Sequence, residues 1–243
     1  MSLVPIKIKN KDLQLIGESD DPKKIYLSES EEFENTIKTT NAMPTFDMEK
    51  LKCLRMLISG SSGSGKTYMA EEVLHQLNPK IVYLFSSIED DDYKDFNVRR
   101  IDLNYILNTN KDLNVHDIYE MIEPKTVAIF DDIVSFGTKL SKPYLELRLL
   151  MLQKGRHKQQ SVLVVEQQAN AGNQKGSREV LLNCNYFIMF PKNNFRSFTS
   201  ISKQYLGIPN KKIEYLQTLK TRYIMISKNY PAYYVSSPEI GML

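Results

Sequence analysis

The sequence predicts an α/β fold in which a mostly parallel sheet is covered by helices on both faces. Two observations support this prediction: short apolar runs rich in β-branched residues recur along the chain, and stretches with helical periodicity lie between them. Strands that are apolar throughout, rather than alternating, are typical of a parallel sheet that is buried on both faces. The expected core strands are Leu54–Ser59, Ile81–Phe85, Val127–Phe130, Val162–Val165 and Tyr186–Phe190.

Helices are expected between these strands. The stretches with the required apolar spacing are "KTYMAEEVLHQL", "VHDIYEMI" and "KPYLELRLLMLQKG", and the third carries Leu145, Leu149 and Leu152 at helical intervals. After residue 195, "NFRSFTSISKQYLG" and "NKKIEYLQTLK" predict two more helices, and "RYIMISK" and "AYYVSS" predict a closing pair of strands. The core therefore has a C-terminal α/β addition.

The length of 243 residues fits one α/β domain with additions, since such domains commonly run to roughly 250 residues. Residues 1–45 are expected to form a short N-terminal extension, in which "VPIKIK" alternates like an edge strand. The charged run "ESDDPKKIYLSESEEFE" is expected to be a solvated loop, with a partner-binding tail as the alternative. Residues 46–243 are then the main domain, elaborated from about residue 195.

Composition describes an ordinary globular chain, with 42% hydrophobic and 25% charged residues and a net charge of +3. That charge permits a nucleic-acid partner without requiring one. Cys53 and Cys184 show no pairing pattern, so we expect reduced thiols. The three histidines match no metal-binding spacing, and no apolar run approaches the length of a membrane span.

Residues 57–69, "LISGSSGSGKTYM", join an apolar strand to a helix through a loop of glycine and serine. Gly60, Gly65, Lys66 and Thr67 fit the P-loop pattern G-x-x-x-x-G-K-[ST]. Glycines let the backbone approach phosphates, and the loop N–H groups with the helix N-terminus form an anion site. We expect Lys66 to reach the β- and γ-phosphates of a nucleotide and the Thr67 hydroxyl to bind Mg²⁺. The expected nucleotide-binding residues are Gly60, Ser61, Ser62, Gly63, Ser64, Gly65, Lys66, Thr67 and Tyr68.

The stretch "TVAIFDD" carries an apolar strand into Asp131 and Asp132. A carboxylate at the C-terminal end of a core strand faces the crevice in which α/β sheets bind ligands. We expect Asp131 to hold Mg²⁺ through water, and Asp132 to orient or activate the attacking water.

"SVLVVEQQ" is another buried strand, and it ends in two amides. We expect Gln167 to touch the γ-phosphate or the attacking water. Gln168 is the alternative, because a shift of one residue reverses the direction of the side chain. Arg156, in "KGRHK", and Arg178, in "KGSREVLLN", are equal candidates for an arginine that acts on a neighbouring subunit's site. For Arg156, a contact to DNA and an ordinary surface position are the alternatives.

Together these residues resemble the viral genome-packaging ATPases of the FtsK–HerA superfamily, which occur in virophages and large DNA viruses. The resemblance rests on "FDMEKLKCLRMLISGSSGSGKT", "VAIFDDI" and "KGRHKQQSVLVVEQQ", and it covers residues 46–190. It implies a P-loop NTPase three-layer sandwich with core strand order 5-1-4-3-2, in which the glutamine-tipped strand separates the other two site strands. Many relatives have Glu at the position of Asp132, so the chain departs from the family there.

The resemblance also implies what the protein works with. It implies ATP and Mg²⁺ as cofactors, and a homo-oligomeric ring of five or six subunits that moves double-stranded DNA into a preformed capsid. A capsid or vertex protein is then a partner, no membrane span is expected, and the location is the host cytoplasm or viral factory, with the virion as an alternative.

Other functions share parts of this pattern. A helicase or another DNA-transfer motor uses the same engine and is the nearest rival. A nucleoside or nucleotide kinase needs an acceptor pocket and often has an arginine-rich lid; no compact lid stands out, but "NVRR" at 97–100 keeps this interpretation open. A GTPase is disfavoured, because "NKDL" at 110–113 has the wrong order for a base-reading motif and precedes Asp131. A non-hydrolysing scaffold is disfavoured by the intact Lys66, Thr67 and paired aspartates.

Overall fold

The structure is a computed structural model that describes residues 6–7, 13–18, 24–28, 36–38, 53–87, 93–167, 176–229, 232–237 and 239–243. It divides into two compact units. One unit spans residues 52–185 and contains the glycine-rich loop, and the other combines residues 1–51 with residues 186–243.

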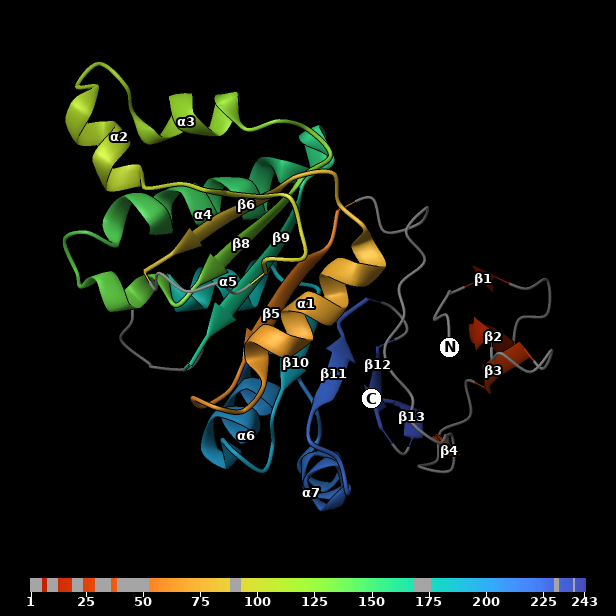
Figure 1. The fold of residues 1–243 in the computed structure, drawn as a ribbon. Coiled ribbons are helices and arrows are strands. Elements are labelled where there is room, and N and C mark those ends of the chain that lie inside the picture. Colours follow the sequence, from red (N-terminus) through yellow and green to blue (C-terminus); the bar gives the residue numbers. More distant parts are fainter. Residues whose placement is uncertain are drawn as a thin grey trace. The chain divides into compact units, whose positions relative to one another are not determined.

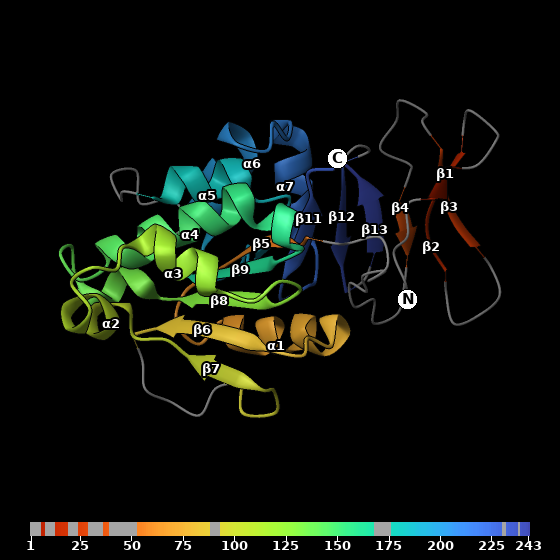
Figure 2. The same ribbon diagram turned by 90° about the horizontal axis from the view of Figure 1, so that it is seen from above.

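The unit 52–185 is built on a sheet whose strands follow the order β5-β9-β8-β6-β7. Strands β5, β9, β8 and β6 are labelled in Figure 1, and β7 is labelled beside β6 in Figure 2. Every neighbouring pair in this order is parallel. The strand bounds are β5 Arg55–Ser59, β6 Val82–Ser86, β7 Val98–Arg100, β8 Val127–Asp131 and β9 Ser161–Glu166. Strand β9 therefore lies between the strand that precedes the glycine-rich loop and the strand that ends at Asp131, which is the expected arrangement of these three strands.

Helices cover both faces of this sheet (Figure 2). Helix α1 (Lys66–Leu77) packs on β5 and β9 from one face, and α4 (Lys142–Lys154) and α5 (Ser177–Asn183) lie on the other. Helices α2 (Leu103–Thr109) and α3 (Val115–Met121) pack against α4. Because continuous apolar strands need cover on both sides, the three layers follow from the strand sequences. The predicted α/β fold class is confirmed.

The structure contains elements in this unit that the sequence did not predict, namely α2, α5 and β7. Strand β7 pairs in parallel with β6, with Val98 opposite Val82. The arginines of "NVRR" are therefore part of the sheet, so this segment does not form a lid. A three-residue edge strand has too few apolar positions to show a period.

The buried side of α4 also differs from the expected leucine stripe. Leu145 and Leu149 are only half-buried. The buried residues of the helix are Tyr144, Leu147, Arg148, Met151 and Leu152. The difference arises because α4 contacts α2, α3 and α5 as well as the 3-10 helix η2 (Gly155–Lys158), so it is covered from several sides.

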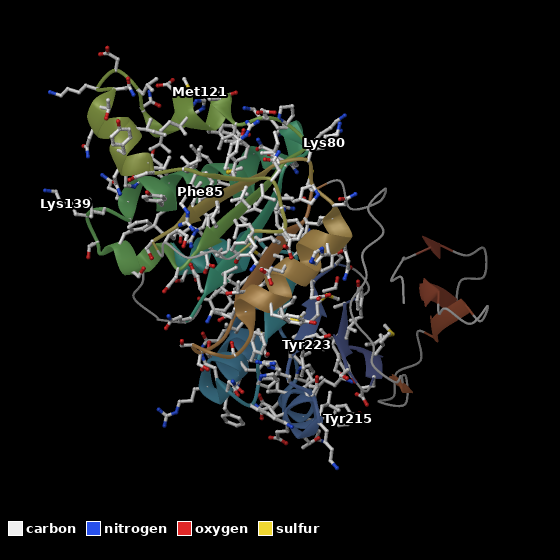
Figure 3. All side chains as sticks on the ribbon, viewed as in Figure 1. Lys80, Phe85, Met121, Lys139, Tyr215 and Tyr223 are labelled. Carbon is white, nitrogen blue, oxygen red and sulfur yellow. The ribbon has the colours of Figure 1, made fainter. Side chains whose placement is uncertain are left out.

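Aromatic side chains fill the space between α4 and the sheet. Phe85 of β6, labelled in Figure 3, stacks on Phe130 of β8 with 4.6 Å between ring centroids. Tyr144 meets Phe85 edge-on at 6.5 Å and stacks on Phe136, in the 3-10 helix η1 (Ile133–Phe136), at 4.6 Å. Both geometries are favourable for aromatic pairs. This cluster fixes the segment that follows the C-terminal end of β8.

The other unit contains an antiparallel sheet with the order β4-β13-β12-β11-β10. The strand bounds are β4 Thr36–Lys38, β10 Tyr186–Met189, β11 Ile224–Ser227, β12 Tyr233–Ser236 and β13 Glu239–Met242. Helices α6 (Phe195–Gln204) and α7 (Asn210–Thr218) contact each other. The predicted helices after residue 195 and the predicted pair of β11 and β12 are confirmed. Among the described residues, no helix is long and apolar enough to cross a bilayer.

The first residues form further strands in this unit. Strands β1 (Ile6–Lys7), β2 (Leu13–Glu18) and β3 (Lys24–Ser28) make a separate antiparallel sheet. The prediction that the charged run is a loop is therefore wrong at β3, where "KIYLS" places strand-favouring residues between the charges. Strand β4 pairs with β13 and extends the C-terminal sheet. The domain boundaries near residues 45 and 195 stay predictions.

One prediction concerns Tyr144, which joins α4 to the start of α2. Its hydroxyl accepts a hydrogen bond from the Leu103 N–H at 3.1 Å and donates one to the Asp102 carboxylate at 3.2 Å. Tyr144→Phe leaves the buried Leu103 N–H without this acceptor, so we expect the free energy of unfolding at pH 7 to fall by about 1–3 kcal/mol.

Burial, and next to it the negative charge of Asp102, raises the pKa of Tyr144 to about 12, from an ordinary value of 10.0. The folded chain therefore holds the Tyr144 proton more tightly than the unfolded chain does. The contribution of this group to the free energy of unfolding is fully present below pH 10 and is lost between pH 10 and pH 12. One such group changes the unfolding free energy by at most about 1.4 kcal/mol per pH unit. Denaturant titrations from pH 8 to 11.5 should show a shallower alkaline loss for Tyr144→Phe than for the parent. Tyr105→Phe, at a residue that is 68% exposed, is the control, and equal slopes for parent and Tyr144→Phe would contradict the prediction.

Candidate functional site

The glycine-rich loop lies between the end of β5 and the start of α1. Gly63 and Gly65 have φ angles of 71° and 99°, in the left-handed region that side-chain-bearing residues rarely adopt. Gly65 is the N-cap of α1, so the loop delivers the chain directly into the first turn of the helix. Backbone N–H groups of this turn and the positive end of a 12-residue helix are suited to an anion.

The loop is tied to the neighbouring strand and to itself. The Gly60 N–H donates to the Glu166 carbonyl at the end of β9, at 3.2 Å, and the Ser64 N–H donates to the Ser61 carbonyl at 3.2 Å. Ser64 is fully buried, whereas Ser62 and Gly63 are exposed at the tip of the loop. The exposed part of the loop is therefore held from both ends.

Lys66 folds back over this loop. Its ammonium group donates a hydrogen bond to the Ser61 carbonyl at 3.0 Å. Burial lowers the pKa of Lys66, while the negative charges of Asp131 and Asp132 raise it. The ammonium group is thus hydrogen-bonded to the loop and lies within the electrostatic influence of both carboxylates. Thr67 follows it in the helix and is half-buried, and Tyr68 is 56% exposed.

Asp131 and Asp132 lie where β8 ends, and the backbone turns sharply between them and the next helix. Asp132 has a φ of 46°, and its N–H donates to the Val165 carbonyl of β9 at 3.0 Å. Its own carbonyl accepts hydrogen bonds from the Ser135 N–H at 3.0 Å, the Ser135 hydroxyl at 2.7 Å and the Ser87 hydroxyl at 3.3 Å. The main chain of Asp132 is fixed on both sides, which restricts where its carboxylate can lie.

Gln167 meets Asp132 across the two strand ends. Its amide Nε2 donates to the Asp132 carboxylate at 3.2 Å, and the side chain is exposed. Register explains this contact, because Val165 of β9 pairs with Asp131 of β8, and Gln167 therefore follows at the same edge. The alternative, Gln168, lies outside the described residues. The structure brings Gln167 and Asp132 together, and their catalytic roles stay predictions.

Tyr93 belongs to this site although its sequence context gave no sign of it. The side chain is 1% exposed, and its hydroxyl donates to the Asp131 carboxylate at 3.0 Å. Its backbone N–H donates to the carboxylate of Glu71 on α1 at 3.3 Å, and its φ is 65°. Tyr93 thereby connects α1 to Asp131. It lies in the acidic stretch "IEDDDYKDF", where no period or motif marks it.

The two candidate arginines are separated by the structure. Arg156 lies in η2 and is exposed, and its carbonyl accepts a hydrogen bond from the Cys53 thiol at 3.6 Å. Cys53 precedes β5, so Arg156 lies near the N-terminal ends of the strands, whereas the glycine-rich loop lies at their C-terminal ends. Arg178 is the second residue of α5 and is exposed. The N-terminus of α5 lies near the C-terminal end of β9, so Arg178 is at the same end of the sheet as the glycine-rich loop.

The donor set fits a phosphate group with a hard divalent cation. The loop supplies N–H groups and one ammonium group, and the adjoining residues supply a threonine hydroxyl and carboxylates. Among the described residues, no cluster of three or more histidine, cysteine or acidic side chains has metal-binding geometry. Mg²⁺ does not need such a cluster, because it keeps several waters and is bound by one or two protein ligands together with phosphates.

The site combines a glycine-rich loop after β5 with an aspartate pair at the end of β8 and a polar residue after the strand between them, which is the arrangement of a P-loop nucleotide-binding protein. Residues 43–188 match the family described as Poxvirus A32 protein. The chain belongs to this family.

The chain is also 30% identical over 196 residues to uncharacterized protein V3 of Sputnik virophage, an alignment that covers 72% of this chain and 71% of the relative. The family match and this relative confirm the resemblance to viral packaging ATPases that the motifs indicated.

Solved structures with a similar fold include the DNA-packaging ATPase B204 of Sulfolobus Turreted Icosahedral Virus. It shares 18% identity, with coverage of 77% of this chain and 95% of that chain and a TM-score of 0.44. The cytoplasmic domain of the Type VII secretion ATPase EccC of Thermomonospora curvata shares 13% identity, with coverage of 96% and 29% and a TM-score of 0.46.

The contact between Tyr93 and Asp131 generates a prediction about metal dependence. Tyr93→Phe removes the hydrogen bond that orients the Asp131 carboxylate and keeps the buried ring. Partners of metal ligands typically affect metal affinity by about 10- to 100-fold when lost. We expect the Mg²⁺ concentration that gives half-maximal ATPase rate to rise by about tenfold, with the rate at saturating Mg²⁺ largely kept.

The measurement is ATPase rate against Mg²⁺ concentration at fixed ATP, with thermal melts to verify folding. Tyr105→Phe, on the exposed side of α2, is the matched control. An unchanged Mg²⁺ dependence in a folded Tyr93→Phe protein would show that Tyr93 does not orient Asp131.

Proposed function

We propose that this protein is the ATP-driven motor that moves double-stranded DNA into a preformed viral capsid. The observation that carries the proposal is the meeting of Gln167 and Asp132, 3.2 Å apart, beside a loop that holds Lys66. A P-loop with one acidic strand serves many reactions. A polar residue directly after the strand between them, in contact with the second carboxylate, supports hydrolysis by an activated water over transfer to a small acceptor.

ATP and Mg²⁺ are the proposed cofactors. Thr67 and Asp131 would hold Mg²⁺, which when bound supplies positive charge to the phosphate oxygens. Lys66 offers a further positive charge at the same group, and it gives up the Ser61 carbonyl for a phosphate oxygen. Asp132 is acceptor-only when ionised, so it can orient a water and accept its proton. Gln167 can hold either that water or the carboxylate in place.

The proposed polymer substrate requires that more than one subunit act. A single P-loop domain has one nucleotide site and no means to hold DNA while it resets. In a homo-oligomeric ring, which we propose to have five or six subunits, neighbours grip the duplex in turn, and a head-to-tail interface closes by rotation. Contacts to phosphates rather than bases would let the motor accept any sequence.

The surroundings of the motor are part of the proposal. A packaging motor needs a capsid or vertex protein as partner, and it works in the host cytoplasm or viral factory or in association with the virion. Residues 1–45 are proposed as an extension and residues 46–243 as the motor domain, elaborated from about residue 195. Arg156 and Arg178 are both proposed as candidates for an arginine supplied to a neighbour, where such residues contribute on the order of 10³-fold or more.

Mixing inactive proteins tests the ring and the arginines together. Lys66→Ala keeps its own arginines, and Arg178→Ala or Arg156→Ala keeps its own Lys66. If one of these arginines acts in trans, a mixture of two inactive proteins on duplex DNA regains ATPase activity, because mixed interfaces contain both groups. Doping wild-type protein with Lys66→Ala at constant total concentration should lower activity more than in proportion. Activity strictly proportional to the wild-type fraction in every mixture would mean independent subunits and would contradict the ring.

A further inference from the structure

A buried ion pair lies next to the site and has no role in the chemistry described above. Arg148 of α4 and Glu166, the last residue of β9, are 1% and 3% exposed, and the Arg148 guanidinium contacts the Glu166 carboxylate directly. Taking two charges out of water is costly, and a buried ion pair can often be replaced by apolar residues without loss of stability. The pair is therefore better explained by the geometry that it imposes on the neighbouring residues than by a gain in stability.

Glu166 occupies a position that connects the two halves of the site. Its carbonyl accepts the hydrogen bond from Gly60 at the start of the phosphate-binding loop, and Gln167 follows it directly. Gln167 is the first residue after β9, so its backbone starts where Glu166 is held. Fixing the Glu166 side chain against Arg148 of α4 therefore restricts the position from which Gln167 reaches Asp132.

Arg148 also fixes a third element. Gly176, the N-cap of α5, has a φ of 98°, and a Cβ atom there would lie 2.9 Å from Nη2 of Arg148. The guanidinium group thus packs against the start of α5 with no room for a side chain between them. Arg148 joins α4, the end of β9 and the helix that carries Arg178. A displacement of α5 by a neighbouring subunit would be passed through Arg148 to Glu166 and Gln167.

The pair is incompletely satisfied. Arg148 contacts one carboxylate oxygen of Glu166, and the other oxygen, Oε2, is buried with no hydrogen-bond partner among the described residues. An unsatisfied buried acceptor costs free energy. This arrangement is unsuited to stabilising the fold, and it is consistent with a pair that holds neighbouring groups in position.

We propose that Arg148 is a positioning residue: through its buried contact with Glu166 and its packing on Gly176, it holds Gln167 against Asp132 and couples α5 to the rate of hydrolysis. The proposal rests on the hydrolytic roles proposed for Gln167 and Asp132. It predicts that the pair affects turnover more than nucleotide binding, because the phosphate-binding loop keeps its own N–H groups and Lys66.

The first test replaces the pair by apolar residues of similar size, Arg148→Met with Glu166→Leu. We expect this double variant to melt near the parent temperature and to bind ATP with a KM within about threefold, since the loop is intact. Its kcat should fall by on the order of 10²-fold, which is typical when a reacting group is displaced by about 1 Å. The control is Arg99→Met with Glu123→Leu, which removes an ion pair whose side chains are about half exposed, and its kcat should match the parent.

The second test does not depend on the double variant folding. Arg148→Lys keeps the charge but loses the planar fork, so we expect a several-fold lower kcat and a smaller loss than in the double variant. In a Gln167→Ala background the same change should have no further effect on kcat, because residues that act through one another are not additive.

Several outcomes separate this inference from the proposed function. A folded double variant with parental kcat, or an Arg148→Lys effect that is equal in both backgrounds, would overturn the positioning role and leave the motor proposal standing. Wild-type protein without ATPase activity would overturn both. A low kcat with unchanged KM in the double variant, together with non-additivity in the Gln167→Ala background, supports the inference.

Discussion

The site depends on the parallel pairing that places β9 between β5 and β8, with Ser59 opposite Glu166 and Asp131 opposite Val165. Parallel strands end at the same edge of a sheet, so this register delivers the phosphate-binding loop, Gln167 and the aspartates to one place. A slip of one residue in β9 would turn Gln167 to the α4 face and remove its contact with Asp132. The apolar strands are buried on both faces of the sheet, and their register therefore also aligns the polar residues at their C-terminal ends.

Two groups of charged side chains lie near the C-terminal ends of these strands. In the first group, burial lowers the pKa of Lys66, and the negative charges of Asp131 and Asp132 raise it. The second group is the ion pair of Arg148 and Glu166, which is buried away from water. Tyr93 donates a hydrogen bond to Asp131 and connects it to α1 through Glu71. Side chains that are held by several elements need little reorganisation when charge develops near them.

Local patterns were enough to predict part of this arrangement. The loop from Gly60 to Thr67 and the pair of aspartates are encoded in contiguous residues next to apolar runs, so the fold class and the core of the site could be read from the sequence. The burial of Arg148 could not be predicted, because an arginine in a helix is expected to be exposed. Its partner Glu166 is 18 residues away in the sequence and is brought to it only by the tertiary structure. Tyr93 was missed for the same reason, since its partners Glu71 and Asp131 are brought to it by tertiary structure. Strand β3 was hidden by the charges around it.

The central claim is that this P-loop site hydrolyses ATP to act on duplex DNA. The most direct measurement is the steady-state ATPase rate of the full chain with no addition, with duplex DNA of random sequence, with single-stranded DNA of equal phosphate content, and with a mixture of nucleosides, each over a range of salt. The account predicts that duplex DNA raises the rate most, that the sequence of the duplex does not matter, and that the stimulation falls steeply with salt because the contacts are to phosphates. Stimulation by single-stranded DNA alone, or transfer of the γ-phosphate to a nucleoside, would contradict it.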